Sequence, residues 1–151
     1  MMTENEAVVK FPSISRNEAF ARSVTAAFAA QMDPTLDELG DIKTAVSEAV
    51  TNVIVHAYPD KIGTVILRLR RLKDNVLEIV VRDTGCGIPD IERARQPMFT
   101  TGGSERSGMG ITIMESFMHS FSIRSVPGKG TTVRMRRRII SRGGENCKPQ
   151  S

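Results

Sequence analysis

The stretch that decides the fold is SEAVTNVIVH, Ser47 to His56, in which a carboxylate and a carboxamide interrupt an apolar run. Glu48 and Asn52 stand four residues apart, so on a helix they project into the same space, about 40° apart around the axis. An unpartnered buried carboxylate is costly, so an acid on a core helix needs an explanation. Either the helix turns both side chains toward solvent, or Glu48 is a proton-accepting base and Asn52 a magnesium ligand.

Length and composition favour one globular domain. The 151 residues suffice for a single hydrophobic core. A composition of 40% hydrophobic and 25% charged residues is ordinary for a globular protein. There is no apolar run of membrane-spanning length and no signal-peptide pattern. Cys86 and Cys147 lack both metal-site spacing and the density of a disulfide scaffold. We therefore expect a reduced, cytoplasmic protein in which residues 1–142 form one domain and residues 143–151 a disordered tail.

Capping boxes mark the starts of two predicted helices, because a hydroxyl residue and a glutamate three positions later can each satisfy an otherwise unpaired backbone amide. Ser15 with Glu18 starts the first helix. Thr35 with Glu38 starts the long helix that carries SEAVTNVIVH and ends before Pro59. The apolar side chains at helical spacing, which we expect in the core, are Phe20, Val24, Ala27 and Phe28 in the first helix and Leu39, Ile42, Val46, Ala49, Val50 and Val53 in the second.

The rest of the chain is rich in strand-forming residues. The predicted strands are residues 1–10, 63–72, 75–83, part of 119–126 and 131–140. The second and third form a hairpin, the last two flank a turn at residues 127–130, and a third helix is expected over residues 109–120. Short connections favour antiparallel pairing. The predicted fold is therefore α/β (α+β): a two-layer sandwich of a mixed, largely antiparallel sheet against about three helices.

Two glycine-rich stretches follow the hairpin. DTGCGI, residues 83–88, directly follows an apolar strand; its glycines let a backbone pass close to a flat ligand, and Asp83 can accept from an exocyclic amine. TTGGSERSGMG, residues 100–110, leads into the third helix, where free amides form an anion site suited to phosphates and Arg106 supplies a cation. Taken singly, each stretch is also compatible with a plain surface loop.

The order of these motifs resembles the Bergerat-type ATP-binding fold of histidine kinases, DNA gyrase, the Hsp90 chaperone and MutL. The helix with Glu48 and Asn52 comes first, then the strand with Asp83, the glycine lid, and Gly130-Thr131-Thr132 in the last strand. This resemblance covers nearly the whole chain and implies ATP and Mg²⁺ between helices and lid. A chain of this size has no room for the dimerisation helices of a histidine kinase or the transducer domains of gyrase, so the small anti-sigma serine kinases match better.

Within that branch the chain is similar to the anti-sigma F factor family of spore-forming bacteria, through SEAVTN, DTGCGIPDIE, ERSGMGITIMESFM and GKGTTV. The resemblance implies a homodimer that, with ATP bound, inhibits the sporulation sigma factor F and phosphorylates a serine of an anti-anti-sigma factor. It implies no direct nucleic-acid partner and no membrane. Two alternatives stay open: an ATP-switched sigma-binding module without kinase activity, and an anti-sigma kinase for a stress-response sigma factor.

The resemblance also implies roles by position. Glu48 matches the general base, Asn52 the magnesium ligand, and Arg22 the partner-contacting arginine of the first helix. Asp83 matches the adenine-reading aspartate, and Arg106 acts in catalysis at the phosphates. The other residues matched to nucleotide binding are Gly85, Gly87, Ile88, Thr100, Gly108, Met109, Gly110 and Thr131. The family often has FTTKP in the lid where this chain has FTTGG, so a lysine that would touch phosphate is missing.

The C-terminal strand is strongly basic. Arg134, Arg136 and Arg138 alternate with other residues and so share one face of the strand. The simpler interpretation is a solvated outer face. The alternative is a docking surface for an acidic partner or nucleic acid, although no aromatic side chains interleave with the arginines as single-strand binding requires.

Overall fold

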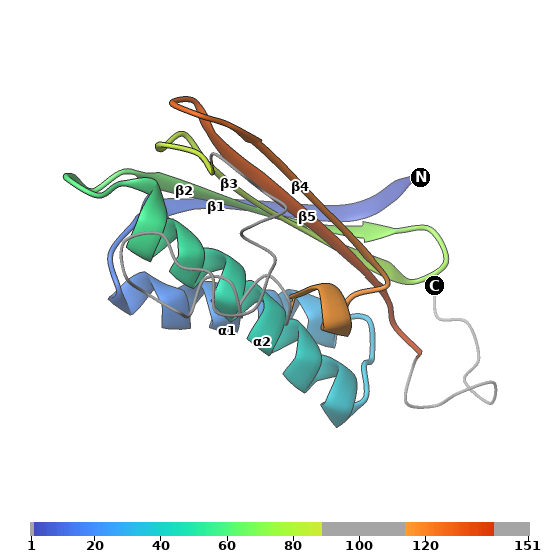
Figure 1. The fold of residues 1–151 in the computed structure, drawn as a ribbon. Coiled ribbons are helices and arrows are strands. Elements are labelled where there is room, and N and C mark those ends of the chain that lie inside the picture. Colours follow the sequence, from blue (N-terminus) through green and yellow to red (C-terminus); the bar gives the residue numbers. More distant parts are fainter. Residues whose placement is uncertain (1, 89–113, 141–151) are drawn as a thin grey trace.

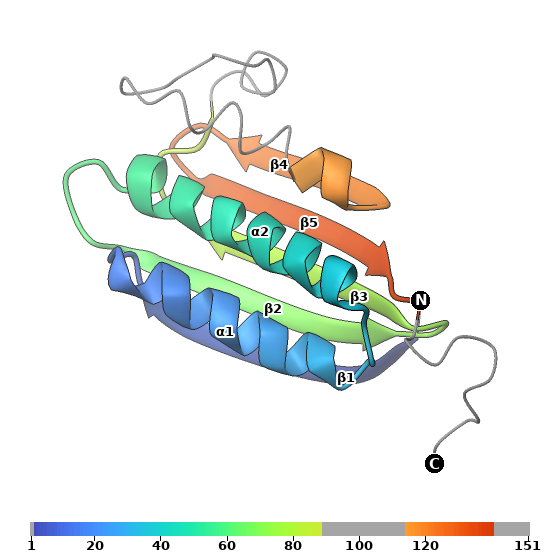
Figure 2. The same cartoon turned by 90° about the horizontal axis from the view of Figure 1, so that it is seen from below.

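The computed structural model describes residues 2–88 and 114–140, and these form a sheet with helices on one face (Figures 1 and 2). The elements are β1 (Thr3–Pro12), α1 (Arg16–Ala30), α2 (Leu36–Asn52), the π-helix η1 (Val53–Ala57), β2 (Thr64–Leu72), β3 (Val76–Asp83), β4 (Ser120–Val126) and β5 (Gly130–Arg138). The five strands lie in the order β1-β2-β3-β5-β4, and each of these pairs is antiparallel. The predicted two-layer fold with a largely antiparallel sheet is confirmed.

The helix α2 begins where its capping box predicts. Thr35 Oγ1 accepts from the backbone N–H of Glu38 at 3.1 Å, and Glu38 Oε1 accepts from the backbone N–H of Thr35 at 2.9 Å. The expected core side chains of α2 are buried, except that Leu39 is only partly buried. After Asn52 the backbone widens into η1, which ends before Pro59 as predicted. Single π-helical turns are rare in proteins overall, and those that do occur are often at functional sites.

The helix α1 begins after Ser15, as predicted, but its first turn is not closed as predicted. Ser15 has helical dihedral angles and its side chain makes no capping hydrogen bond, so the predicted Ser15–Glu18 capping box is wrong. A capping side chain reaches the N–H of the third helical residue only from an extended backbone, which Thr35 has and Ser15 lacks. Glu18 instead lies beside Arg22, one turn along the helix, at 3.6 Å.

The buried face of α1 is also rotated from the predicted one. Its buried residues are Ala21, Thr25, Phe28 and Ala29. Phe20 and Ala27, which were expected in the core, are exposed, and Phe20 is 47% exposed. Small side chains allow α1 to approach α2 and the sheet closely, so Ala21 and Thr25 take the inner positions. The Phe20 ring packs edge-on against Phe11 at the margin of the core, with 6.1 Å between ring centroids.

The β2–β3 hairpin turns where the sequence predicts. Asp74 and Asn75 both have left-handed backbones, with φ of 68° and 59°, which is the requirement of a tight type I′ turn. The Asn75 side chain also donates to the Ile139 carbonyl at 2.9 Å. The turn therefore fixes the hairpin register and holds the end of β5.

The third predicted helix falls mostly on residues outside the described ranges. Residues 114–117 are helical, whereas residue 120 already begins β4, so the predicted end at residue 120 is too late. Met114 and Met118 are buried against the core. Among residues 2–88 and 114–140, no helix is both long and apolar enough to cross a membrane.

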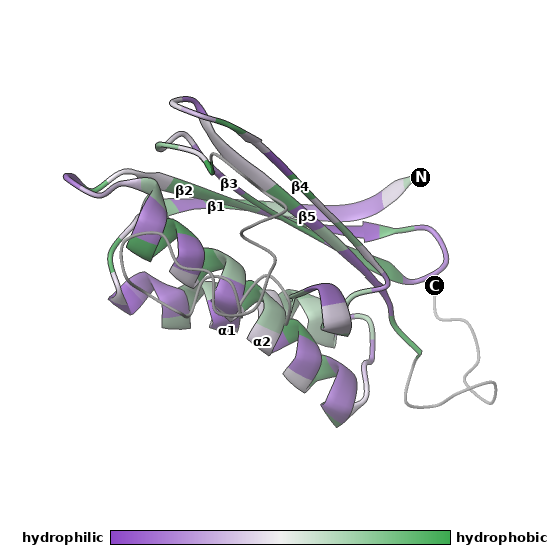
Figure 3. Ribbon diagram, in the orientation of Figure 1, coloured by the Kyte–Doolittle hydropathy of each residue, from purple (hydrophilic) through white to green (hydrophobic). Residues whose placement is uncertain are grey.

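The two faces of the sheet differ in chemistry. Inward side chains of the three central strands are buried under the helices, where hydrophobic and hydrophilic segments alternate along α1 and α2 (Figure 3). On the open face the carboxylate of Glu78 is only 1% exposed. Arg136 contacts it at 2.8 Å, and Arg70 and Arg134 lie 3.7 Å away. The predicted basic face is thus the open side of the sheet, and part of its charge is neutralised within the protein.

Candidate functional site

Asp83 ends β3 and is the centre of the candidate site. Its carboxylate is 6% exposed, and Oδ1 accepts from the backbone N–H groups of Gly85 at 2.9 Å and Thr131 at 3.3 Å. Burial raises the pKa of this carboxyl above its ordinary value, and the two backbone hydrogen bonds oppose that rise. Because both bonds use Oδ1, the oxygen Oδ2 is the atom that can accept a donor from a ligand.

The loop after Asp83 is tightly packed against the rest of the fold. A side chain at Gly85 would collide with the backbone carbonyl of Ala57 at the end of η1. Gly87 has φ of +77°, and a side chain there would lie 2.6 Å from the Val126 carbonyl oxygen. The structure thus shows these glycines closely packed against other segments of the protein, and their predicted approach to a flat ligand stays a prediction.

A second set of contacts fixes the far end of the loop. The backbone N–H of Ile88 donates to Ser125 Oγ at 2.6 Å, and Ser125 Oγ lies 2.9 Å from Thr131 Oγ1. The N–H of Gly128 donates to the Cys86 carbonyl at 2.7 Å. These contacts join the loop to β4 and β5. The structure thus brings together Asp83, Gly85, Gly87, Ile88 and Thr131, as the sequence predicted, and adds Ser125.

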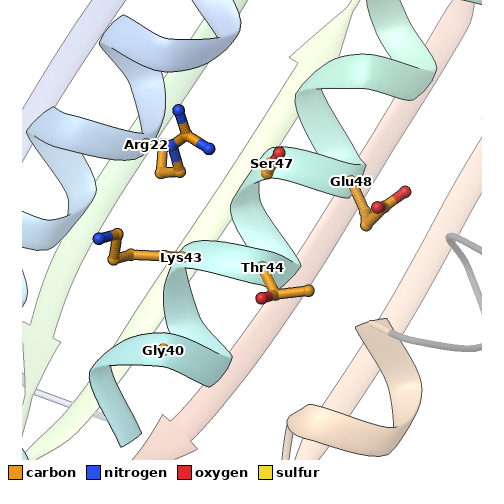
Figure 4. Close-up of a pocket in the computed structure, with 6 residues that line it drawn as sticks. All are labelled: Arg22, Gly40, Lys43, Thr44, Ser47 and Glu48. Atoms are coloured by element: carbon orange, nitrogen blue, oxygen red, sulfur yellow. The ribbon is translucent and has the colours of Figure 1, made fainter. Parts of the chain in front are cut away.

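Glu48 and Asn52 lie on the last turns of α2, and both are half-buried. Glu48 lines a cavity of about 430 Å³ over the outer side of α2, together with Arg22, Gly40, Lys43, Thr44 and Ser47. In Figure 4, Arg22 of α1 and the side chain of Lys43 lie on the side of α2 that faces α1, while Glu48 points to the other flank of α2. The Arg22 side chain is 42% exposed. The predicted partner-contacting arginine, Arg22, and the predicted base, Glu48, thus both line this cavity, and the arginine is accessible from solvent.

The remaining predicted site residues belong to the lid. Thr100, Arg106, Gly108, Met109 and Gly110 lie outside the described residues.

The side chains present suit a magnesium ion that is shared with phosphates. Within the described ranges, no three His, Cys, Asp or Glu side chains gather into a metal site of their own. Magnesium usually takes one or two protein oxygens and completes its shell with water and phosphate oxygens. An amide oxygen from Asn52 meets that requirement, with the carboxylate of Glu48 one turn earlier on α2.

Two residues with contacts to the site were missed by sequence reasoning. Tyr58 bonds to the backbone of Thr84, next to Asp83, and Ser125 bonds to Ile88. Tyr58 is the only tyrosine of the chain and directly follows the apolar run of α2 and η1, which was the one available signal. Ser125 offers none, since a serine on an edge strand is ordinary.

Comparison with protein families identifies the fold family. The histidine kinase-like ATPase domain matches residues 11–137. An anti-sigma F factor of Caldanaerobacter subterraneus is 56% identical over 140 residues, which cover 92% of this chain and 97% of that protein. An anti-sigma F factor of Bacillus subtilis is 50% identical over 137 residues, covering 90% and 94%.

Solved structures agree on the fold alone, since their sequence identities are low. The RsbU and RsbW domains of a Mycobacterium tuberculosis protein superpose with a TM-score of 0.67 at 17% identity, covering 89% of this chain and 32% of that one. The chain therefore spans about a third of that structure's length. The mycobacterial sensor histidine kinase MprB gives a TM-score of 0.55 at 16% identity, covering 88% and 97%.

Proposed function

This chain belongs to the anti-sigma F factor family of histidine kinase-like ATPase domains, and on that premise we propose that it binds and inhibits the sporulation sigma factor F and phosphorylates a serine of an anti-anti-sigma factor with ATP. The observation that supports nucleotide binding is the buried carboxylate of Asp83. Its Oδ1 accepts from two backbone N–H groups, and its Oδ2 can accept from a ligand. Buried carboxylates with a raised pKa are enriched at functional sites, and Asp83, unlike Glu78, has no arginine beside it among the ion pairs of the described residues.

The proposed adenine site is the cluster around Asp83. Asp83 Oδ2 accepts from the exocyclic amine, and the residues beside the base are Gly85, Gly87, Ile88 and Thr131. For the lid residues Thr100, Arg106, Gly108, Met109 and Gly110, the role at the phosphates rests on the family resemblance.

The proposed chemistry is phosphoryl transfer, in which catalysis is mostly positioning and charge neutralisation. The serine oxygen forms a bond to the terminal phosphorus as the bond to the ADP oxygen breaks, and Glu48 takes the hydroxyl proton. Asn52 would hold a magnesium ion, which would supply positive charge to neutralise the phosphates. The position of Glu48 on the rim of an open cavity supports a base that a protein substrate can reach.

We place the partner proteins at the same cavity. Arg22 is accessible there and lines the same cavity as Glu48, with the two side chains on opposite flanks of α2, so a partner docked over α2 would reach both. The proposal includes a homodimer in the cytoplasm, in line with the family.

The deciding experiment replaces Glu48 by Gln, which keeps the shape of the side chain and removes the base. We expect labelling of the anti-anti-sigma factor by radioactive ATP to fall about 100-fold or more, while ATP and sigma factor binding persist. Asp37→Asn is the matched control, because Asp37 is an exposed acid at the opposite end of α2. A partner that stays unlabelled even with the unaltered protein would support an ATP-switched binding module instead.

Partner identity is tested separately. Capture of purified sigma factors with and without ATP distinguishes sigma factor F from a stress-response sigma factor. Preferential retention of the stress-response factor would contradict the proposal.

A further inference from the structure

The hydroxyl of Tyr58 joins three separate segments next to Asp83. The residue is 7% exposed. Its Oη donates to the Thr64 carbonyl at 2.8 Å and accepts from the backbone N–H of Thr84 at 2.9 Å. It also lies 3.3 Å from Thr84 Oγ1. One buried oxygen therefore connects the end of η1, the start of β2 and the residue directly after Asp83.

Neighbouring contacts make this junction continuous. The Ala57 carbonyl accepts from the N–H of Cys86 at 2.8 Å, and the His56 carbonyl accepts from Cys86 Sγ at 3.2 Å. On the other side, a side chain at Gly63 would collide with the Tyr58 ring, so the ring is enclosed. Residues 56–58 and 84–86 are thus packed against each other along their whole length.

The junction links the two halves of the candidate site. The helix with Glu48 and Asn52 continues directly into η1, and the end of η1 is hydrogen-bonded to the loop after Asp83. We propose that Tyr58 is a positioning residue for adenine recognition, whose hydroxyl sets the place of the Asp83 carboxylate relative to α2. This inference rests on the proposed function, because it takes Asp83 as the residue that reads the base.

The physical reason lies in the N–H of Thr84. Without the phenol oxygen this N–H loses its acceptor and the Thr64 carbonyl loses its donor, in a part-buried junction next to the buried Asp83 carboxylate, and polar groups left without partners there cost free energy. The loop then relaxes to regain a partner. A hydrogen bond to adenine tolerates only a few tenths of an ångström of such movement before it weakens.

The test is Tyr58→Phe, which retains the ring and removes the oxygen. We expect ATP affinity to fall about three- to tenfold, as for the loss of one well-placed hydrogen bond. GTP carries a carbonyl in place of the amine, so we expect it to bind more weakly than ATP, with an affinity that Tyr58→Phe changes little. The ratio of ATP to GTP affinity should therefore fall by a similar factor.

Thr25→Val is the matched control. Thr25 is fully buried and its hydroxyl donates to the Ala21 carbonyl at 2.8 Å within α1. Removing it also deletes one buried hydroxyl bond and is expected to lower the melting temperature without changing the affinity ratio. If Tyr58→Phe likewise keeps the ratio of the unaltered protein, Tyr58 is merely structural and the proposal is overturned.

A second measurement needs no variant. Because the chain has one tyrosine, incorporation of 3-fluorotyrosine gives a single fluorine resonance in this 151-residue chain. ATP should shift this resonance and GTP should shift it less, and a resonance that ATP leaves unmoved would overturn the proposal. Failure of the unaltered protein to bind ATP would instead contradict the proposed function itself, so the two outcomes are distinguishable.

Discussion

At the scale of single residues, the buried charge of Asp83 is proposed to serve ligand binding but lowers the stability of the fold. Its carboxylate is buried, and burial raises its pKa because the charged form loses water. A raised pKa in an acid means that the folded protein binds its proton more tightly than the unfolded chain. The charge therefore destabilises the fold at neutral pH, and this cost disappears as the pH falls below the ordinary carboxyl pKa.

Replacing Asp83 by Asn should separate the two effects. The amide oxygen can still accept from the N–H groups of Gly85 and Thr131, while the buried charge is gone. We expect a melting temperature equal to or above that of the unaltered protein at neutral pH. ATP affinity should fall at least about tenfold, because an amide N–H₂ then faces the adenine amine.

The pH dependence provides the check on Asp83→Asn. The stability gained by the variant should be greatest at neutral pH and should shrink as the pH is lowered through the raised pKa of the carboxyl. Thermal melts of both proteins across the acid range measure this difference. A gain that grows toward low pH would show that the carboxylate stabilises the fold.

At the scale of elements, α1 and α2 differ in how their first turns are closed. The Thr35–Glu38 capping box is fully formed, whereas Ser15 makes no side-chain capping bond. Thr35→Ala should therefore cost about 1 kcal/mol in the free energy of unfolding. Ser15→Ala is its matched control and should cost about a few tenths of a kcal/mol at most. Denaturant titration measures both, and equal losses would contradict the difference between the caps.

The same comparison explains what the sequence could predict among the elements. The start of α2 and the β2–β3 turn depend on residues three or fewer positions apart, so their signals are local. The Ser15–Glu18 signal is equally local, and it failed because Ser15 has a helical backbone from which its side chain cannot cap. The buried face of α1 depends on α2 and the sheet, and there the small Ala21 displaced the large Phe20. A periodic pattern cannot show which side chains fit closest to a neighbouring helix.

The candidate site shows the same division. The sequence could group Asp83, Gly85 and Thr131 because their motifs are contiguous in sequence and lie at strand ends, and the structure places the three together. Tyr58 was missed because its hydroxyl bonds to Thr84, 26 positions away, and only the folded chain brings them together.

At the scale of the whole molecule, helices cover one face of the sheet, and ion pairs link the strands on the other face. Glu78 lies on the central strand β3, between Arg70 of β2 and Arg136 of β5. Its carboxylate therefore ties three strands together on the face that the helices leave open (Figure 1). The arginines remain partly exposed, so they shield the acid while keeping contact with water.

This arrangement predicts that Glu78 contributes more to stability than an ordinary surface acid. Glu78→Gln keeps the shape but removes the charge that faces the arginines. We expect a loss of about 1.5–2 kcal/mol in the free energy of unfolding, in the lower half of the range for charged hydrogen bonds, because Arg136 and Arg70 are 35% and 30% exposed.

Glu6→Gln is the matched control for Glu78→Gln, because Glu6 on β1 contacts the same Arg70 at 2.8 Å but is itself 43% exposed. An exposed pair is worth little, so this change should cost about 0.5 kcal/mol or less, and salt should remove most of that. Urea titrations at low and high ionic strength measure both variants. The loss in Glu78→Gln should persist in high salt, since buried charges are screened less. Equal small losses would mean that the arginines rehydrate freely and that packing beneath the helices alone holds the sheet.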